Sequence, residues 1–437
     1  MQAVIMAGGK GTRLRAITND EIPKPMAPIA GKPILQWQIE ALRRGGVTDV
    51  ILVVGHLGEK IEEFFGDGGA FGVHISYYRE EQPLGTAGAL AELGERLEKT
   101  FLLVFGDTIF DISIPRMLAF HREKEALATL FVHPNSHPFD SDIVLRDPDG
   151  RVRELLSKHE ERTGWYDNCV NAGFYVIQRE LCARIPEGEK TDLEKQLLWP
   201  TAKEGGKIYA YLSPEYIKDV GTPERIAVAE EELRTGVVAA RNLERPQRCV
   251  FLDRDGTVNQ YRGLVSQPEQ LELEENAAEA IRRLNRSGYL AIIVTNQPVV
   301  ARGMCSVEDV ERIHDKLKTL LGQEGVYVDD IRFCPHHPDK GYPEENPAYK
   351  IPCRCRKPDI GMLADCASAY HIDLERSWMV GDTTMDLQTG KNAGTRTALV
   401  LTGQAGQDGK YAAAPDVTGK DLLDAVEQIL KESEETA

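Results

Sequence analysis

Hydrophobic and polar positions alternate along the chain in two separate series. In each series, short apolar runs of strand length alternate with stretches of helical periodicity, the rhythm of βαβ units in a mostly parallel sheet. The first series extends from Met1 to about Leu233 and includes Val4–Met6, Ile34–Arg44, Val50–Val54, Ile61–Phe65, Phe101–Phe105 and Pro115–Lys124. The second includes Cys249–Leu252, Ala277–Arg286, Leu290–Val294, Val307–Leu321, Trp378–Val380 and Thr397–Leu401. The pattern predicts an α/β protein.

A break separates the two series. In RTGVVAARNLERPQR the apolar periodicity lapses, charges gather and Pro246 stops any helix. We therefore predict two domains, residues 1–232 and 248–437, joined by a linker at 233–247. The length of 437 residues agrees, because it exceeds what one hydrophobic core usually serves.

Composition and charge narrow the classes of partner. The chain is 42% hydrophobic and 28% charged, which is ordinary for a globular protein, and its net charge is −17. The negative electrostatic field of such a chain argues against nucleic acid and anionic membranes as partners. Phosphorylated substrates must therefore be captured locally, by basic side chains, backbone N–H groups or divalent cations. Apolar runs such as Leu290–Val294 are far shorter than the roughly 20 residues of a membrane helix, and we do not expect MQAVIMAGGKG to act as a signal peptide. We expect a cytoplasmic protein; the sequence leaves open whether it forms a homo-oligomer.

A glycine-rich loop follows the first predicted strand. The strand Ala3–Ala7 leads into Gly8, Gly9, Lys10, Gly11, Thr12, Arg13 and Leu14. Glycines let backbone N–H groups approach a polyphosphate, and Lys10 and Arg13 would neutralise its charge. A Gly-rich turn that only reverses the chain is the alternative. The spacing is not that of a Walker A loop.

Further motifs follow in a fixed order: Lys24 in PKPMAPIAGKPIL, QPLGTAGAL at Gln82–Leu90, Gly106-Asp107, NAGFYVI from Asn171, and Asp219 in KDVGTPE. With the loop, they resemble the sugar-1-phosphate nucleotidylyltransferases over residues 1–232. That resemblance implies a Rossmann-like domain that joins a nucleoside triphosphate to a sugar 1-phosphate and releases pyrophosphate.

The resemblance also implies site residues. The nucleotide would contact Gly8, Gly9, Lys10, Gly11, Thr12, Gln82, Gly85, Thr86 and Asp107. Arg13 would lie near the leaving pyrophosphate and Lys24 near the α-phosphate, while Asp107 and Asp219 would hold Mg²⁺. Asn171 and Lys158 would contact the sugar phosphate. The nucleobase stays open, because this loop occurs in members that use different bases. Taken alone, Asp107 and Asp219 could instead cap helices.

Carboxylates also follow strands in the second half. Cys249–Leu252 delivers Asp253 and Asp255 in DRDGT, and one such carboxylate can attack phosphorus while the other moves protons. Other strands deliver Thr295-Asn296-Gln297 and Asp382 to Asp386, and Lys357 stands in CRKP. For DRDGT alone, a simple turn is the alternative. The ordered set predicts one site at the strand ends.

This set resembles the haloacid dehalogenase superfamily over about residues 248–432. The resemblance implies a second Rossmann-like domain in which Asp253 is the nucleophile and Asp255 the general acid and base. Thr295 and Lys357 would bind the transferring phosphoryl group, and Asp253, Asp255 and Asp382 would surround Mg²⁺, with Asp386 in an outer shell.

Three cysteines and a histidine suggest a second metal in this half. Cys334-Pro335-His336 and Cys353-Arg354-Cys355 flank a loop with little apolar content, which a structural Zn²⁺ could close. Unpaired buried cysteines are the alternative. We prefer His336 to His337 because the family pattern is C-x-H.

The zinc loop narrows the resemblance to heptose bisphosphate phosphatases and histidinol phosphatases. Substrate-facing positions of the former are matched by Asn296, Gln297, Arg302, Arg356 and Lys357, whereas Tyr261–Leu264 departs from the usual pattern. The fusion favours the heptose enzyme, because its product, a sugar 1-phosphate, is a substrate for the first domain. We expect removal of the 7-phosphate of D-glycero-α-D-manno-heptose 1,7-bisphosphate and guanylyl transfer from GTP to heptose 1-phosphate. An ADP-heptose version, another phosphosugar, or one non-catalytic domain are the alternatives.

Overall fold

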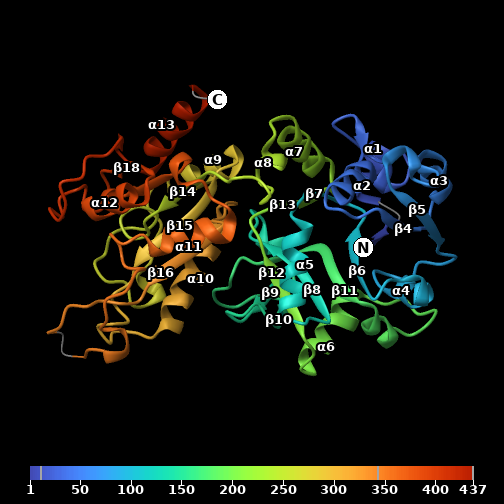
Figure 1. Cartoon of the computed structure of the whole chain (residues 1–437), viewed down its shortest axis with the longest axis horizontal. Helices are drawn as coiled ribbons and strands as arrows, with labels where there is room; N and C mark the ends of the chain where they lie inside the picture. The colour runs from blue at the N-terminus through green and yellow to red at the C-terminus, as the bar shows by residue number, and fades with distance from the viewer. Residues whose placement is uncertain (10–11, 342–343, 436–437) are drawn as a thin grey trace. The chain divides into compact units, whose positions relative to one another are not determined.

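The computed structural model describes residues 1–9, 12–341 and 344–435, with the backbone alone at 12, 434 and 435. The chain forms two compact units (Figure 1). Unit 1 contains Met1–His133, Asp142–Ser157 and Cys169–Asn242, and unit 2 contains Pro134–Ser141, Lys158–Asn168 and Leu243–Ala437. Among the described residues, no helix combines the length and apolarity needed to cross a bilayer.

A nine-stranded mixed sheet forms the centre of unit 1, in the order β10-β9-β11-β6-β1-β4-β5, with β8 paired to β11 and β12. Its strands are β1 (Gln2–Met6), β4 (Asp49–Val54), β5 (His74–Arg79), β6 (Thr100–Phe105), β8 (Ala128–His133), β9 (Ile143–Arg146), β10 (Val152–Leu156), β11 (Val170–Gln178) and β12 (Ile208–Leu212). Strand β1 lies between β4 and β6, parallel to both, with Val4 opposite Ile51 and Leu103. Small antiparallel ladders join β2 (Pro28–Ile29) to β3 (Lys32–Pro33) and β7 (Thr108–Asp111) to β13 (Tyr216–Asp219).

Apolar side chains cover both faces of this sheet because successive strand residues point to opposite sides. Ala3 and Ile5 pack into one core with α2 and α5, whereas Val4 packs into the other with α4. The helices of unit 1 are α1 (Arg15–Thr18), α2 (Ile34–Arg44), α3 (Gly58–Phe65), α4 (Gly88–Leu93), α5 (Ile114–Glu123), α6 (Trp199–Lys203), α7 (Pro223–Arg234) and α8 (Val237–Ala240).

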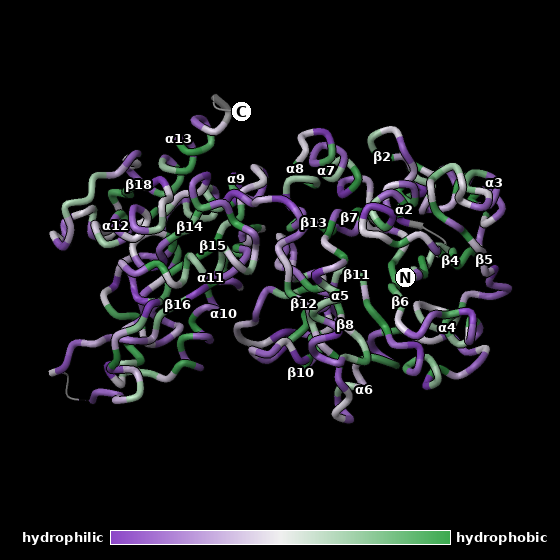
Figure 2. Tube along the Cα trace, viewed as in Figure 1, coloured by the Kyte–Doolittle hydropathy of each residue, from purple (hydrophilic) through white to green (hydrophobic). Residues whose placement is uncertain are grey.

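Unit 2 is built on a six-stranded sheet in the order β16-β15-β14-β17-β18-β19, and every pairing is parallel. Its strands are β14 (Cys249–Leu252), β15 (Leu290–Asn296), β16 (Asp330–Cys334), β17 (Trp378–Gly381), β18 (Arg396–Val400) and β19 (Val417–Gly419). Its helices are α9 (Ala277–Ser287), α10 (Val307–Gln323), α11 (Gly361–Tyr370), α12 (Thr384–Ala393) and α13 (Leu422–Glu435). Hydrophobic residues concentrate along β14 and β15 (Figure 2).

The central strands of unit 2 are buried on both faces. Val250 and Leu252 pack with α9, α10 and α13, while Cys249 and Phe251 pack with α11 on the other side. This double covering explains why these strands are continuous apolar runs. The predicted α/β class is confirmed in both units.

The segment between the two predicted domains is partly helical. Helix α7 continues to Arg234, and Val237–Ala240 forms the short helix α8. Unit 1 ends at Asn242, so α8 belongs to it.

Candidate functional site

In unit 2, the carboxyl ends of three parallel strands place polar side chains at one edge of the sheet. Asp253 follows β14, Thr295 lies near the end of β15, and Asp382 follows β17. Strand β14 lies between the other two, with Leu252 opposite Ile293 and Val380. The sheet therefore brings these separate segments together.

Lys357 is the cation of this site. Its Nζ lies 2.8 Å from Asp253 Oδ1 and 2.6 Å from Asp386 Oδ1, and only 3% of its side chain is exposed. Burial opposes its charge, but the carboxylates of Asp253 and Asp386 outweigh burial and raise the pKa of Lys357. Asn296 fixes the lysine backbone: its Oδ1 accepts from Lys357 N at 3.0 Å, and its Nδ2 donates to Lys357 O at 3.1 Å.

Three buried carboxylates, Asp253, Asp382 and Asp386, can offer oxygens within 4.8 Å of one another. Burial raises the pKa of Asp253 to about 6, with Lys357 opposing the rise and Asp386 adding to it. Burial, and then the charges of Asp253 and Asp386, raise the pKa of Asp382 to about 8. One lysine thus leaves this cluster short of positive charge.

The cluster fits a hard divalent cation. Carboxylate oxygens are the ligands that Mg²⁺ takes in proteins. Asp382 Oδ1 is buried and has no hydrogen-bond partner in the described part of the chain, although Oδ2 accepts from Gln404 N at 2.7 Å. Gly256, at φ +85°, leaves space for this carboxylate, because a Cβ there would lie 2.4 Å from Asp382 Oδ2. A bound cation would supply the missing positive charge and partner.

The carboxylate of Asp255 lies in a different set of contacts. It accepts hydrogen bonds from Arg254 Nη2 at 2.9 Å, Asn259 Nδ2 at 3.0 Å and Gln297 Nε2 at 2.8 Å. Gln297 also donates to Thr295 Oγ1 at 2.9 Å. The side chain that joins Asp253 and Asp382 in the carboxylate cluster is therefore Asp386, which the sequence placed in an outer shell.

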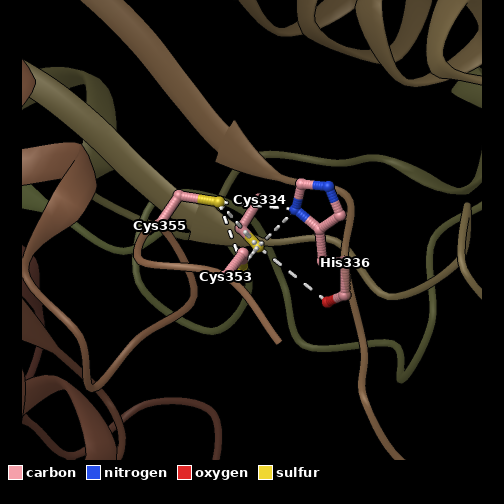
Figure 3. A group of neighbouring side chains, drawn as sticks. All are labelled: Cys334, His336, Cys353 and Cys355. Carbon is pink, nitrogen blue, oxygen red and sulfur yellow. Dashed lines mark hydrogen bonds between the residues drawn. The ribbon is translucent and has the colours of Figure 1, made fainter. Parts of the chain in front are cut away.

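Cys334, His336, Cys353 and Cys355 form a compact cluster (Figure 3). Cys355 Sγ lies 3.3 Å from Cys334 Sγ, 3.2 Å from Cys353 Sγ and 3.5 Å from His336 Nδ1. Thiolate sulfurs about 2.3 Å from a tetrahedral zinc would be about 3.8 Å apart, so small outward shifts of the three sulfurs would admit the ion. His337 lies outside the cluster; its Nδ1 accepts from Asp339 N at 3.2 Å.

Basic side chains lie beside this cluster. Arg356 Nη1 donates to His336 O at 3.0 Å, so the loop that carries the cluster also holds this guanidinium. Burial, followed by the charges of Arg356, Arg302 and Lys350, lowers the pKa of His337, although Asp339 opposes this. The predicted substrate residues Arg302 and Arg356 thus share one neighbourhood, and Arg356 directly precedes Lys357 in the chain.

In unit 1, the ladder between β7 and β13 brings two predicted metal ligands together. Asp219 pairs with Thr108, and Val220 N donates to Asp107 O at 2.8 Å. Lys24 Nζ forms an ion pair with Asp107 Oδ2, with 12% of the lysine side chain exposed. Two carboxylates and a cation therefore meet at the end of this ladder.

The side chains around Gly221 show that this site is tightly built. A Cβ on Gly221 would lie 2.7 Å from Asp219 Oδ1, 3.1 Å from Arg13 Nη2 and 3.2 Å from Lys24 Nζ. Asp219 also forms an ion pair with Arg225, the third residue of α7. Arg13, Lys24, Asp107 and Asp219 thus converge, and the two carboxylates suit Mg²⁺.

The predicted nucleotide loops follow two strands of the same sheet, β1 and β5. Gly8 and Gly9 follow β1, while Lys10, Gly11 and the side chain of Thr12 lie outside the described residues. A Cβ on Gly8 would be 2.6 Å from Glu80 Oε2, and Glu80 Oε1 accepts from Leu84 N at 3.2 Å. Glu80, which the sequence analysis did not select, therefore links the two loops.

The loop from Gln82 to Thr86 is held by hydrogen bonds to Thr191 and Leu193. Thr86 N donates to Thr191 O at 3.0 Å, and Thr86 Oγ1 accepts from Leu193 N at 2.7 Å. A Cβ on Gly85 would lie 2.5 Å from Thr191 O, so only glycine fits. Gln82 is exposed.

Asn171 lies in a partly buried polar cluster. Its Nδ2 donates to Tyr175 Oη at 2.7 Å and to Glu194 Oε1 at 3.0 Å. Burial raises the pKa of Glu194, and the hydrogen bond from Tyr175 opposes the rise. Glu194 lies in a π-helix, Leu193–Leu198, a distortion frequent at functional sites. The sequence analysis missed it, because its signal, a glutamate in TDLEKQ, looks like a surface residue. Lys158 is exposed and belongs to unit 2.

Comparisons with known proteins cover both halves of the chain. The family model described as nucleotidyl transferase matches residues 2–236, and one described as HAD-like hydrolase matches residues 354–425. A mannose-1-phosphate guanylyltransferase of Mycobacterium tuberculosis is 35% identical over 258 residues, which are 59% of this chain and 70% of the relative.

Relatives of the second half are phosphatases. A D-glycero-D-manno-heptose-1,7-bisphosphate 7-phosphatase of Thermosynechococcus vestitus is 38% identical over 191 residues, which are 42% of this chain and 96% of the relative. Among solved structures, the D,D-heptose 1,7-bisphosphate phosphatase of B. bronchiseptica, in complex with magnesium and phosphate, is 36% identical, with a TM-score of 0.37. It covers 43% of this chain and 99% of its own. Both halves therefore match enzymes.

Proposed function

This chain belongs to the nucleotidyl transferase family through residues 2–236 and to the haloacid dehalogenase-type phosphatases through its C-terminal part, and from this premise we propose a bifunctional enzyme of nucleotide-activated heptose synthesis. It removes the 7-phosphate of D-glycero-α-D-manno-heptose 1,7-bisphosphate and then transfers a nucleotidyl group, GMP from GTP, to heptose 1-phosphate. The observation that carries the proposal is one chain with two clusters of charged side chains, one in each unit, where the product of one proposed reaction is a substrate class of the other.

The phosphatase step assigns one role to each side chain. Asp253 attacks phosphorus and forms an aspartyl phosphate while the bond from phosphorus to the sugar oxygen breaks. Asp255 gives a proton to that leaving oxygen and later takes one from the water that releases phosphate. Lys357, already 2.8 Å from Asp253, neutralises the phosphoryl group, with Thr295 as a further donor. Mg²⁺, held by Asp253 and Asp382 together with Asp255 or Asp386, would supply charge neutralisation.

In the transferase step, a phosphate oxygen of heptose 1-phosphate attacks the α-phosphorus of GTP, and pyrophosphate leaves. This oxygen is already anionic, so the site needs positioning and charge neutralisation instead of a general base. Lys24 would neutralise the α-phosphate and Arg13 the leaving pyrophosphate. Asp107 and Asp219 would hold Mg²⁺, which supplies further charge neutralisation when bound.

Two further assignments complete the proposal. Zn²⁺ bound to Cys334, His336, Cys353 and Cys355 would be structural, because four protein ligands leave no open position. We place the domain boundaries at 1–232 and 248–437. We prefer GTP because a mannose-1-phosphate guanylyltransferase is among the relatives, at 35% identity.

The test follows both reactions in one vessel. Purified protein is incubated with Mg²⁺, the α- or β-anomer of the bisphosphate and one of four nucleoside triphosphates, and phosphate, pyrophosphate and nucleotide sugar are measured by mass. We expect phosphate first and GDP-heptose second. Asp253→Asn should abolish only phosphate release, and Asp107→Ala only the transfer from supplied heptose 1-phosphate. ADP-heptose as the main product would refute the base assignment, and transfer without phosphate release would refute the phosphatase.

A further inference from the structure

A fully buried arginine stands between the two aspartates that follow β14. The side chain of Arg254 has no exposed surface, and a charged side chain is almost never buried so completely without partners. Its guanidinium forms a fork on the carboxylate of the next residue: Nη2 lies 3.0 Å from Asp255 Oδ1 and 2.9 Å from Oδ2, and Nε donates to Oδ1 at 3.2 Å. Neither step of the phosphatase reaction proposed above uses this arginine.

Helix α10 holds the guanidinium through a histidine. Arg254 Nη1 lies 3.1 Å from His314 Nε2, and both side chains are buried. An arginine offers donors only, so Nε2 accepts this hydrogen bond and the imidazole is neutral. Burial, followed by the charges of Arg254 and Lys318, lowers the pKa of His314 well below its usual value, in agreement with a neutral ring. The ring of Phe333, in β16, packs edge-on against His314 with the ring centroids 5.2 Å apart.

Two side-chain amides complete the contacts of Asp255. Asn259 Nδ2 donates to its Oδ1 at 3.0 Å, and Gln297 Nε2 donates to its Oδ2 at 2.8 Å. Both carboxylate oxygens therefore face N–H donors, and a rotation of the side chain would break several hydrogen bonds at once. Gln297 also donates to Thr295 Oγ1 at 2.9 Å, so the same contacts place the carboxylate beside the proposed phosphoryl ligand.

We propose that Arg254 and His314 position the Asp255 carboxylate for proton transfer, an inference that rests on the phosphatase function proposed above. A general acid or base acts only within hydrogen-bond reach of the proton that it moves, so a fixed carboxylate favours the reaction. In the second half of the reaction, a water oxygen bonds to phosphorus, the bond from phosphorus to Asp253 breaks, and Asp255 takes the water proton. Arg254 and His314 are positioning residues, because they act through Asp255.

The test compares full-length variants that remove or keep the contact between α10 and the guanidinium. His314→Leu removes the acceptor of Arg254, whereas His314→Gln places an amide oxygen near the position of Nε2. Arg254→Met removes the fork itself. Lys316→Met is the matched control, because it deletes another hydrogen bond of the same helix, from Lys316 Nζ to Pro268 O at 2.8 Å.

The first readout is turnover of the bisphosphate. General acid–base catalysis contributes about 10²–10⁴-fold, so a loosened Asp255 should lose part of this factor. We expect kcat to fall roughly tenfold in His314→Leu and roughly 100-fold in Arg254→Met. The rescuing variant His314→Gln and the control Lys316→Met should keep the wild-type kcat.

A second substrate separates proton transfer from a general disturbance of the fold. 4-Nitrophenolate is a weak base that leaves without a proton, so 4-nitrophenyl phosphate needs the base of the second step but no acid in the first. In His314→Leu and Arg254→Met, we expect kcat for this ester to fall while kcat/KM stays within about twofold of the wild type, with a burst of nitrophenolate before the steady state. For the bisphosphate, kcat and kcat/KM should fall together, because the sugar oxygen must be protonated as it leaves.

The outcomes distinguish the positioning role from the alternatives. Equal losses of kcat/KM for the two esters would overturn it in favour of a structural role. Wild-type turnover of the bisphosphate in His314→Leu, or a loss in His314→Gln as large as in His314→Leu, would also overturn it. If the wild type accepts the bisphosphate alone, the rescue by His314→Gln decides. A wild-type protein that releases no phosphate from either ester would instead refute the proposed phosphatase, and the positioning role with it.

Discussion

Replacing Lys357 by Met should impair the phosphatase in two separable ways. The lysine contacts Asp253 at 2.8 Å and Asp386 at 2.6 Å in a buried site, so the variant removes the cation and keeps much of the volume. A hydrogen bond to a charged group contributes about 1.5–3 kcal/mol, which is roughly one to two pKa units at 1.36 kcal/mol each. The pKa of Asp253, about 6 in the wild type, should rise by that amount.

This shift predicts the pH dependence of catalysis. A raised pKa keeps Asp253 protonated to higher pH, so the acid limb of the kcat/KM profile should move up by about one to two units. Loss of the cation that faces the phosphoryl group should also lower the alkaline plateau by roughly 10²–10³-fold. Bound Mg²⁺ would lower the pKa of Asp253 in both proteins, so the informative quantity is the difference between their two pH profiles at saturating Mg²⁺.

The assay is phosphate release from pH 5 to 9, with nucleotidyl transfer from supplied heptose 1-phosphate measured on the same preparation. An unchanged rate of nucleotidyl transfer shows that unit 1 is folded. The matched control is Lys391→Met, which replaces an exposed lysine of α12. Removing one partner of a buried pair costs about 3–5 kcal/mol, so thermal unfolding is recorded as well. An unshifted acid limb with less than a tenfold loss of plateau would refute the reasoning.

Three further predictions concern other parts of the molecule. Cys355→Ser should lower the zinc content found by mass spectrometry. A loss of about 3 kcal/mol of unfolding free energy should reduce the Tm of unit 2 by about 6–12 °C, whereas Cys305→Ser should keep both the zinc content and the Tm. Full zinc content in Cys355→Ser would contradict the ligand set. Burial, and then the charge of Arg122, lowers the pKa of His121 to about 4. Between pH 6.5 and pH 4, His121 is therefore neutral in the folded protein but takes up a proton in the unfolded chain. The free energy of unfolding should fall as the pH drops from 6.5 towards 4. His121→Gln should therefore reduce the stability difference between pH 7 and pH 5, measured by urea unfolding, by about 2 kcal/mol; an unaltered difference would count against a neutral buried histidine. Gly221→Ala should slow nucleotidyl transfer about 10²-fold and leave phosphate release unchanged, because its Cβ would displace Asp219, and equal transfer rates would disprove the crowding.

Much of the architecture could be predicted because it is encoded locally. The run Cys249–Leu252 is β14, and Leu290–Val294 lies within β15, so the residues that follow these strands meet where parallel strands end. Cysteine spacing likewise predicted the cluster of Cys334, Cys353 and Cys355. In these cases period and spacing alone determine which side chains come together.

The remaining features depend on contacts that no local pattern records. Residues 158–168 follow β10 in sequence, yet they lie on α10, because side chains far along the chain supply their partners. Glu194 looks like a surface residue until the partners of Asn171 are known. Asp386 joins the carboxylate cluster because the first turn of α12 directs it towards Lys357, a choice that residue type does not reveal.

The pairing of Asp219 with Thr108 has a consequence for synthesis of the chain. All of residues 112–215 must be made before β13 can pair with β7, and closing so long a loop is an entropic barrier that local contacts do not relieve. Strands β1, β4 and β5 can pair much earlier, because their connections are short. On the ribosome, the β1-β4-β5 part of the sheet should therefore form before the two carboxylates meet, and a nascent chain that ends before Asp219 should fold in part but bind no metal with Asp107.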